Sequence, residues 1–151
     1  KMAPLGNDTY NLPYPLDDDT YNFSFSGLKS AVLNLVNNEK MRGNLIRKED
    51  LACSFQNRVA TIIVKKTRKA LLQYKVSNLV MAGGVAANKR LRSDLEELAK
   101  ELGINFSVPD FKYCTDNAYM IASAAYYAYK KNIVADLSLN AKAVDSLYDY
   151  K

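Results

Sequence analysis

Apolar residues recur every three or four positions over two early segments of the chain, and this period is typical of amphipathic helices. The first segment follows Ser26, a good helix-capping residue, and we expect Asn37-Asn38 to end its helix. Its apolar stripe consists of Leu28, Ala31, Val32, Leu35 and Val36. The second segment covers residues 49–74 and predicts a long helix with one apolar face and a basic outer face.

A short apolar run at residues 79–82 meets Gly83-Gly84 and predicts a strand that ends at a tight turn. A leucine stripe then predicts a helix that Gly103 ends. The stripe consists of Leu91, Leu95, Leu98 and Leu102. Residues 104–108 alternate as a second strand. A strand, helix, strand unit with a right-handed crossover makes the two strands a parallel pair, so the predicted fold class is α/β, helix-rich with a short parallel strand pair.

The chain divides into three parts by its composition. Residues 1–22 hold most of the prolines and the acidic run Asp17 to Asp19, so we expect an extended, loop-rich lead-in. Residues 23–134 form the folded helical and α/β part, and the weakly patterned residues 135–151 form a tail. Within the folded part, the capping residues Thr115, Asp116 and Asn117 precede an apolar, tyrosine-rich helix at residues 118–131.

Composition narrows the functional classes. The chain has 151 residues and 48% hydrophobic content, which suits one soluble globular domain. It has no histidine, so it holds neither a Ser-His-Asp triad nor an HExxH zinc helix. Its two cysteines show no CxxC spacing, which favours a reducing, cytoplasmic setting. We expect no membrane segment, and because Lys1 precedes Met2 we expect the sequence to be a piece of a longer chain.

The net charge of +5 is compatible with a polyanionic partner but is common in proteins without one. Four basic residues gather on the outer face of the helix at residues 49–74: Lys65, Lys66, Arg68 and Lys69. Two interpretations stay open, a solvated helix face and a patch that contacts phosphates.

Gly83-Gly84 is the first candidate site, because ligands of open α/β sheets bind at the carboxyl ends of strands. Two residues without side chains let a ligand approach the backbone, and the following helix start offers free N–H donors. Asn88, in the first turn or so of that helix, could bond a sugar hydroxyl or a base edge. The alternative is a tight turn without a ligand.

Asp116 is the second candidate, because a carboxylate at a loop-to-helix junction either caps the helix or binds a cation. Cys114 could ligate a soft metal, although a buried thiol is the simpler interpretation. Ser24 and Ser26 are interpreted as caps, since no base in the chain could activate them. Lys29 could touch a phosphate or lie on an exposed helix face.

Four segments, in their order and gaps, resemble one family. It is the tRNA threonylcarbamoyladenosine transferase family, long described as O-sialoglycoprotein endopeptidase or glycoprotease. The segments are residues 21–29 (YNFSFSGLK), residues 54–56 (SFQ), residues 81–88 (MAGGVAAN) and residues 114–122 (CTDNAYMIA). The resemblance runs from about residue 10 to residue 139 and covers only the later part of a family member.

The resemblance implies an actin-like, hexokinase-like ATPase fold of two lobes, of which this chain would be a fragment of the second. It implies a parent enzyme that transfers threonylcarbamoyl from its adenylate to the exocyclic amine of the adenosine beside the anticodon of tRNA. Protein partners would make the adenylate and regulate turnover. With tRNA as substrate, seven basic residues become possible phosphate contacts: Lys65, Lys66, Arg68, Lys69, Lys89, Arg90 and Arg92.

By the same match, Gly83, Gly84 and Asn88 would bind the nucleotide, either ATP or threonylcarbamoyl-adenylate. Asp116 would be one ligand of a divalent metal, iron, zinc or magnesium, whose two histidine ligands come from the first lobe. One carboxylate is a poor metal site, so we expect the fragment alone to be catalytically inactive.

Two other functions stay open. One is the older metalloprotease, or glycoprotease, assignment of the family. The other is a non-catalytic truncated paralogue that binds partner proteins through its apolar helices. For any of them, apolar surface left where a first lobe would dock predicts that the fragment self-associates.

Overall fold

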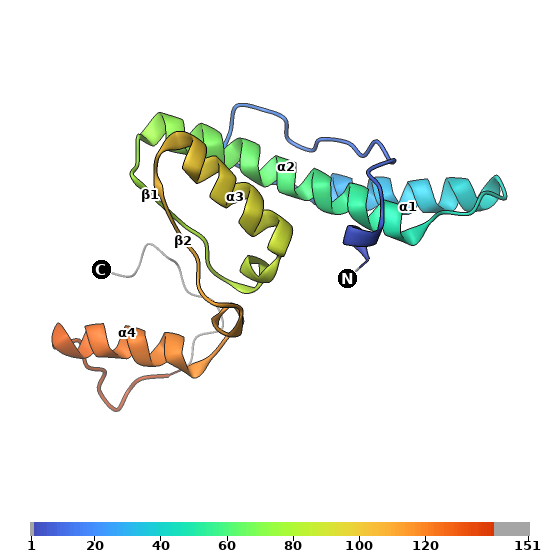
Figure 1. The fold of residues 1–151 in the computed structure, drawn as a ribbon. Coiled ribbons are helices and arrows are strands. Elements are labelled where there is room, and N and C mark those ends of the chain that lie inside the picture. Colours follow the sequence, from blue (N-terminus) through green and yellow to red (C-terminus); the bar gives the residue numbers. More distant parts are fainter. Residues whose placement is uncertain (1, 141–151) are drawn as a thin grey trace. The chain divides into compact units, whose positions relative to one another are not determined.

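The computed structural model describes residues 2–140 (Figure 1). The first half contains the 3-10 turn η1 (Ala3–Leu5) and the helices α1 (Ser26–Met41) and α2 (Lys48–Tyr74). The strand β1 (Asn78–Val80), the 3-10 turn η2 (Gly84–Ala87), the helix α3 (Lys89–Leu102) and the strand β2 (Asn105–Ser107) follow. The last elements are the 3-10 turn η3 (Phe111–Tyr113) and the helix α4 (Ala118–Lys130).

The described residues form two compact units. The first runs to Cys114 and the second begins at Thr115, so the part predicted to fold at residues 23–134 falls into two. The predicted tail begins in the second unit, and its residues 141–151 lie outside the described range. Among the described residues, no helix combines the length and apolar character that a membrane crossing requires.

Helix α1 runs further than its sequence pattern predicts. Asn37 and Asn38 lie exposed inside it, so the prediction that they end the helix is wrong. Asparagine costs only about half a kcal/mol within a helix, which is too little to end it. Glu39 holds the last turn through Arg42 at 3.0 Å and Asn44 at 2.7 Å. The true stop is Gly43, whose φ of 75° favours glycine.

The predicted serine caps of α1 are also wrong. The residue before the helix is Phe25, no side chain caps the first turn, and Ser26 is already the first helical residue. The hydroxyls of Ser24 and Ser26 lie 3.1 Å apart and hydrogen-bond each other. Leu28, which begins the apolar stripe, is fully buried.

The predicted long helix is confirmed as α2, and the lead-in lies against it. The lead-in contains η1 and is otherwise irregular, as predicted, and it runs beside α2 (Figure 1). Asn7 N–H donates to Asp50 Oδ1 at 2.8 Å, and Tyr10 N–H donates to the buried Ser54 hydroxyl at 3.0 Å. Further along, Lys66 Nζ donates to the backbone oxygen of Thr20 at 2.8 Å. The lead-in is therefore bound to α2 over several turns.

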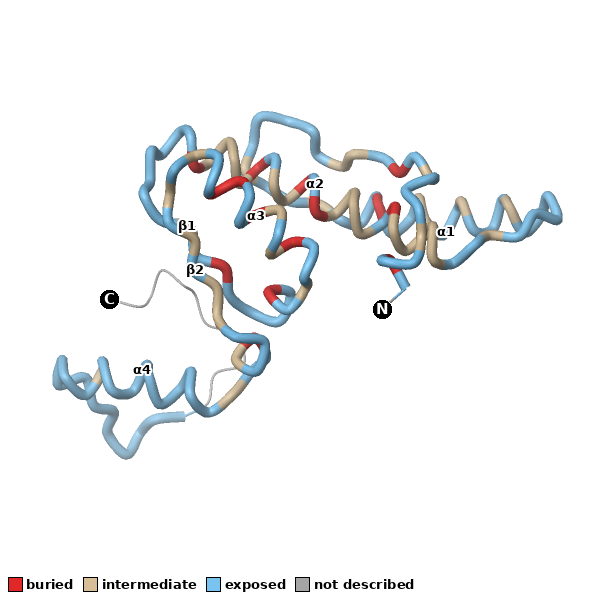
Figure 2. The backbone as a smooth tube through the Cα atoms, in the orientation of Figure 1, coloured by how far each residue is buried: buried red, intermediate tan, exposed pale blue. Residues whose placement is uncertain are grey.

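The strand, helix, strand unit is confirmed as a parallel pair. Leu79 of β1 is in register with Phe106 of β2. Gly103 ends α3 with a φ of 67°, as predicted. The apolar stripe of α3 packs on α2 and the strands, and buried positions gather along α2, η2 and α3 (Figure 2). The core consists of Ala60, Leu71, Met81, Ala86, Leu91, Leu95, Leu98 and Cys114.

The contact of the lead-in with α2 depends on Gly6. A Cβ added at Gly6 would lie 2.1 Å from the backbone oxygen of Glu49 and 2.6 Å from Asp50 N. Because backbone atoms cannot move aside, Gly6→Ala should lower the free energy of unfolding by more than about 1 kcal/mol. Urea denaturation followed by circular dichroism measures this change.

Gly27→Ala is the matched control, because its added Cβ finds only Pro15 Cβ, at 3.9 Å. Within α1 this change should leave stability unchanged or raise it by up to about 1 kcal/mol. If Gly6→Ala were as stable as the unmodified chain, the lead-in would not lie against α2 as described.

Candidate functional site

The turn after β1 places an open stretch of backbone at the end of the strand. Gly83 has φ 88° and ψ 176°, a conformation open essentially only to glycine. A Cβ added at Gly83 or Gly84 would meet no atom within 4 Å, so the space beside both residues is free. The predicted tight turn is confirmed. A ligand could approach its backbone without displacing protein atoms.

The sequence pattern predicts that the helix begins directly after the glycines, and this prediction is wrong. The turn η2 intervenes, with Ala86 N–H bonded to Gly83 O and Asn88 N–H bonded to Val85 O, both at 2.9 Å. Among the described residues, no acceptor is recorded for the N–H groups of Gly84 and Val85. They remain able to donate to a ligand.

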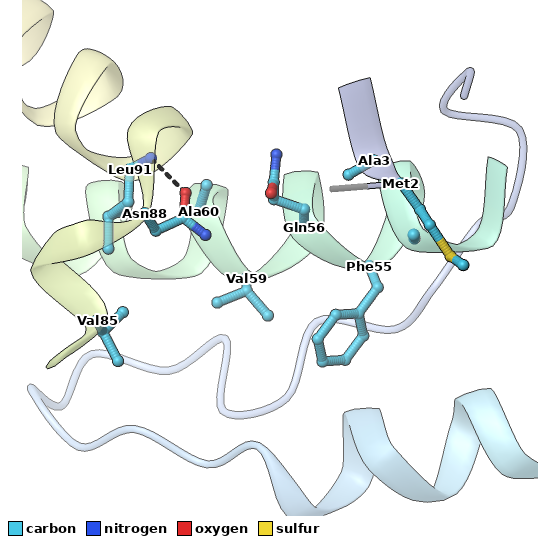
Figure 3. Close-up of a pocket in the computed structure, with 10 residues that line it drawn as sticks. Met2, Ala3, Phe55, Gln56, Val59, Ala60, Val85, Asn88 and Leu91 are labelled. Carbon is cyan, nitrogen blue, oxygen red and sulfur yellow. Dashed lines mark hydrogen bonds between the residues drawn. The ribbon is translucent and has the colours of Figure 1, made fainter. Parts of the chain in front are cut away.

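Asn88 lies immediately before α3 and caps it. Its Oδ1 accepts the N–H of Leu91 at 3.1 Å, so half of the side-chain amide is committed to the helix (Figure 3). The sequence predicts Asn88 inside the first turn of this helix, whereas it lies one residue before the helix begins. Within the described part of the chain, no acceptor is recorded for its Nδ2 group, and the residue is half-buried. That amide group is available to a ligand.

Asn88 shares a pocket of about 400 Å³ with residues of α2 (Figure 3). Phe55 and Gln56 contribute from α2, and Val85 contributes from η2. Two of the segments that carry the family resemblance thus meet in space. The remaining lining is mostly apolar and consists of Met2, Ala3, Ala52, Val59, Ala60 and Leu91.

Gln56 is the site residue that sequence reasoning did not single out. It is half-buried, and the described residues provide no hydrogen-bond partner for its side-chain amide. Its only signal in the sequence was membership in the segment at residues 54–56. The helical pattern of α2 predicts that a polar residue at this position faces solvent, because periodicity does not show which element packs beside it.

A second pocket of about 720 Å³ adjoins the first and shares Ala3, Gln56 and Asn88 with it. It adds two cations, Lys89 and Arg90. Arg90 is bound to Asp94 at 2.8 Å and to Asn57 Oδ1 at 3.0 Å. The two pockets together offer an apolar surface, the side-chain amides of Gln56 and Asn88, and positive charge. This arrangement suits a ligand with a planar base and an anionic group.

In the second unit, Asp116 does not cap α4. Asn117 is the cap, and its Oδ1 accepts Met120 N–H at 3.3 Å. Asp116 is exposed, and the capping interpretation of this residue is wrong because its neighbour takes that role. Cys114, in the first unit, is confirmed as a buried thiol with 1% of its surface exposed.

The residues described do not by themselves fit a divalent metal. No three acidic or cysteine side chains among residues 2–140 come together in a way that could hold an ion. Asp116 offers one carboxylate, whereas hard and borderline cations need several ligands in a fixed geometry. Any metal bound at Asp116 must take its other ligands from outside the described residues.

Comparison with known proteins decides the family. The model of the family described as tRNA N6-adenosine threonylcarbamoyltransferase matches residues 1–123. The chain belongs to this family. The match includes the pocket residues Gln56 and Asn88 as well as Asp116.

Curated members of this tRNA-modifying transferase family align with nearly the whole chain. The protein of Staphylococcus haemolyticus is 47% identical over 143 residues, which are 94% of this chain and 42% of the relative. The protein of Bacillus subtilis is 45% identical over 155 residues, with 100% of this chain and 44% of the relative covered. Both carry the name tRNA N6-adenosine threonylcarbamoyltransferase. The chain spans less than half the length of these relatives.

Because the family modifies tRNA, the basic face of α2 is a candidate for phosphate contact. Acidic side chains of this chain, however, already pair with its basic residues. Lys66 Nζ lies 2.9 Å from Asp18, and Lys69 Nζ lies 3.1 Å from Asp19. Lys65 pairs with Asp17, whose carboxylate raises the pKa of the lysine. Arg68 Nη1 donates to Glu101 at 2.6 Å. Each Asp of the lead-in run thus neutralises one lysine.

The predicted outer position of Lys66 is wrong, because the lead-in covers this lysine and leaves only 7% of it exposed. Helical periodicity alone could not show a segment 46 residues earlier in the chain lying over α2. Of the other predicted phosphate contacts, Arg90 is ion-paired, Arg92 points into the protein, and Lys89 is exposed. Phosphate contact by the seven basic residues stays a prediction.

The pairing of Asp18 with Lys66 predicts a specific dependence of stability on pH. Hydrogen bonds from Lys66 and then Thr20 lower the pKa of Asp18 from 3.8 to about 2. A carboxyl whose pKa is depressed by folding stabilises fully above its unfolded pKa, and this contribution disappears as pH falls through the folded value. Asp18→Asn should therefore flatten the loss of unfolding free energy between about pH 4 and pH 2.

Urea denaturation at a series of pH values measures this difference. Lys66→Gln removes the partner and should flatten the same part of the curve. A curve for Asp18→Asn parallel to that of the unmodified chain would contradict the pairing.

Proposed function

We propose that this chain is the nucleotide-holding part of a transferase that modifies adenosine in tRNA. The observation that carries the proposal is the pocket in which Gln56 of α2 and Asn88 before α3 meet beside the open Gly83 turn. Side-chain amides donate and accept hydrogen bonds, which suits the edge of an adenine base. The apolar lining suits its faces, and the exposed Lys89 of the adjoining pocket suits phosphate.

The reaction proposed for the whole protein is the one that its relatives' names describe. The exocyclic amine of adenosine attacks the carbamoyl carbon of threonylcarbamoyl-adenylate. The new C–N bond forms, the C–O bond to the phosphate breaks, AMP leaves, and the amine loses one proton. In this scheme Asn88 and Gln56 bind and orient the adenylate, and the apolar residues around them keep water from the activated carbonyl group.

Asp116 is proposed as one ligand of a divalent metal, iron, zinc or magnesium, completed by groups outside the described residues. Such a metal would supply Lewis-acid polarisation when bound. We likewise propose that the chain is a fragment of the second lobe of an actin-like ATPase fold, which protein partners and a first lobe complete. Its parallel β1 and β2 pair with α3 between them is compatible with that fold.

The older protease interpretation has less support. The relatives quoted above are named as transferases, and the chain has no histidine with which to activate a serine or a water molecule. Nothing in the pocket favours a peptide over a nucleotide. A non-catalytic partner-binding role and self-association of the fragment stay open predictions.

Replacing Asn88 tests the pocket. Asn88→Ser keeps a residue that caps α3 well, so the thermal midpoint should change little, while the amide donor is lost. We expect ATP to bind the chain weakly and the variant to bind it roughly tenfold more weakly, the usual effect of losing one hydrogen bond of about 1.5 kcal/mol. Isothermal titration calorimetry measures both affinities.

Asn117→Ser is the matched control, because it makes the same change at the cap of α4. It should leave ATP affinity unaltered. Equal ATP binding by Asn88→Ser and the unmodified chain would contradict the assignment of this pocket, and equal binding of GTP would contradict its preference for adenine.

We also expect the chain alone to form no threonylcarbamoyladenosine. The reason is that no metal-binding group of three ligands exists among residues 2–140 and that the sequence has no histidine. Nucleoside mass spectrometry after incubation with tRNA, threonine, bicarbonate, ATP and the adenylate-forming enzyme tests this. Product above the level of a reaction without the chain would show that it is catalytically complete.

A further inference from the structure

The side chain of Arg92, in the first turn of α3, joins three segments of the first unit. Its Nε donates to the backbone oxygen of Ala86 in η2. Its Nη2 donates to the backbone oxygen of Pro109 at 2.5 Å and to Cys114 Sγ at 3.0 Å. Its guanidinium carbon lies 4.2 Å from the centre of the Phe111 ring. One side chain thus touches the turn beside the pocket and both ends of the loop at residues 109–114.

The partners of Arg92 are unusual because none is a carboxylate. Within the described residues, its charge forms no ion pair, and its acceptors are two backbone oxygens and a thiol. Arg90, two positions earlier, is ion-paired to Asp94 at 2.8 Å and belongs to the exposed face of α3. Arg92 is half-buried, so replacing it would leave backbone oxygens in a partly desolvated place without donors.

The geometry points to Arg92 as a positioning residue that fixes the Gly83–Asn88 turn and the loop at residues 109–114 against α3, and so sets the shape of the nucleotide pocket. This inference rests on the proposed function only for what the pocket binds. The planar fork matters, because Nε and Nη2 donate side by side to Ala86 and Pro109. Lysine, a single point charge, cannot hold two backbone oxygens in that fixed relation.

Arg92→Lys keeps the charge and removes the fork, and Arg42→Lys, at an exposed arginine that follows α1 and lies outside the pockets, is the matched control. Both are made in a Cys53→Ser background, so that Cys114 is the single thiol that a reagent can modify. Amide hydrogen exchange by NMR reports on the N–H groups of Ala86, Asn88 and Cys114, which hold the turn and the loop. The N–H of Lys29 in α1 reports on general stability.

For Arg92→Lys we expect exchange at the turn and loop amides, and reaction of Cys114 with Ellman's reagent, to accelerate on the order of tenfold. Exchange at Lys29 in this variant, and all rates in Arg42→Lys, should change far less. Addition of ethylguanidinium to Arg92→Ala should restore slow exchange in part, which a general loss of stability would not explain.

Nucleotide binding separates this inference from the proposed function. If the unmodified chain binds ATP, Arg92→Lys should weaken binding by about as much as Asn88→Ser does, although Arg92 does not line the pocket. If the unmodified chain binds no ATP, the proposed function fails while the exchange rates still decide the role of Arg92. Uniform acceleration at Ala86, Cys114 and Lys29 alike would overturn the positioning role.

Discussion

The contact between α2 and α3 is the constraint on which the first unit depends. The leucine stripe of α3 closes against Ala60 and Leu71 of α2, and the two short parallel strands pack at its edge. The lead-in packs along α2 through hydrogen bonds and three lysine-aspartate pairs. The pocket follows from this arrangement, because Gln56 lies on α2 where the turn before α3 reaches it. Loss of the helix contact would separate Gln56 from Asn88.

Asn88 shows how structure and binding share one side chain. Its oxygen closes the first turn of α3, while its nitrogen remains available beside the open backbone of Gly83. Arg92, one turn further, holds the same turn from behind through Ala86. A ligand contacting the turn would therefore meet a backbone already fixed on α3. Such preorganisation reduces the entropy that binding must overcome.

Local patterns predicted more of the fold than of the site. The periods of the apolar residues predicted α2, α3 and the parallel strands, because each element buries one continuous face. They could not show that Asn37 and Asn38 lie inside α1, where side-chain bonds at the helix end outweigh a weak propensity. They could not place Gln56 in a pocket, or pair Asp18 with Lys66, because both depend on segments far apart in the chain. The family segments indicated the site, and the packing of α2 beside the turn before α3 brings Phe55 and Gln56 into it.

An ATP titration of the isotope-labelled chain, followed by NMR, tests the nucleotide pocket most directly. If the pocket holds the nucleotide, the side-chain amide signals of Gln56 and Asn88 and the backbone amides of Gly84 and Val85 shift together, with one shared dissociation constant. Amides of α1 should stay in place. Shifts confined to the lysines that pair with the lead-in, or no shift at Gln56 and Asn88 while ATP binds elsewhere, would contradict a nucleotide site between α2 and α3.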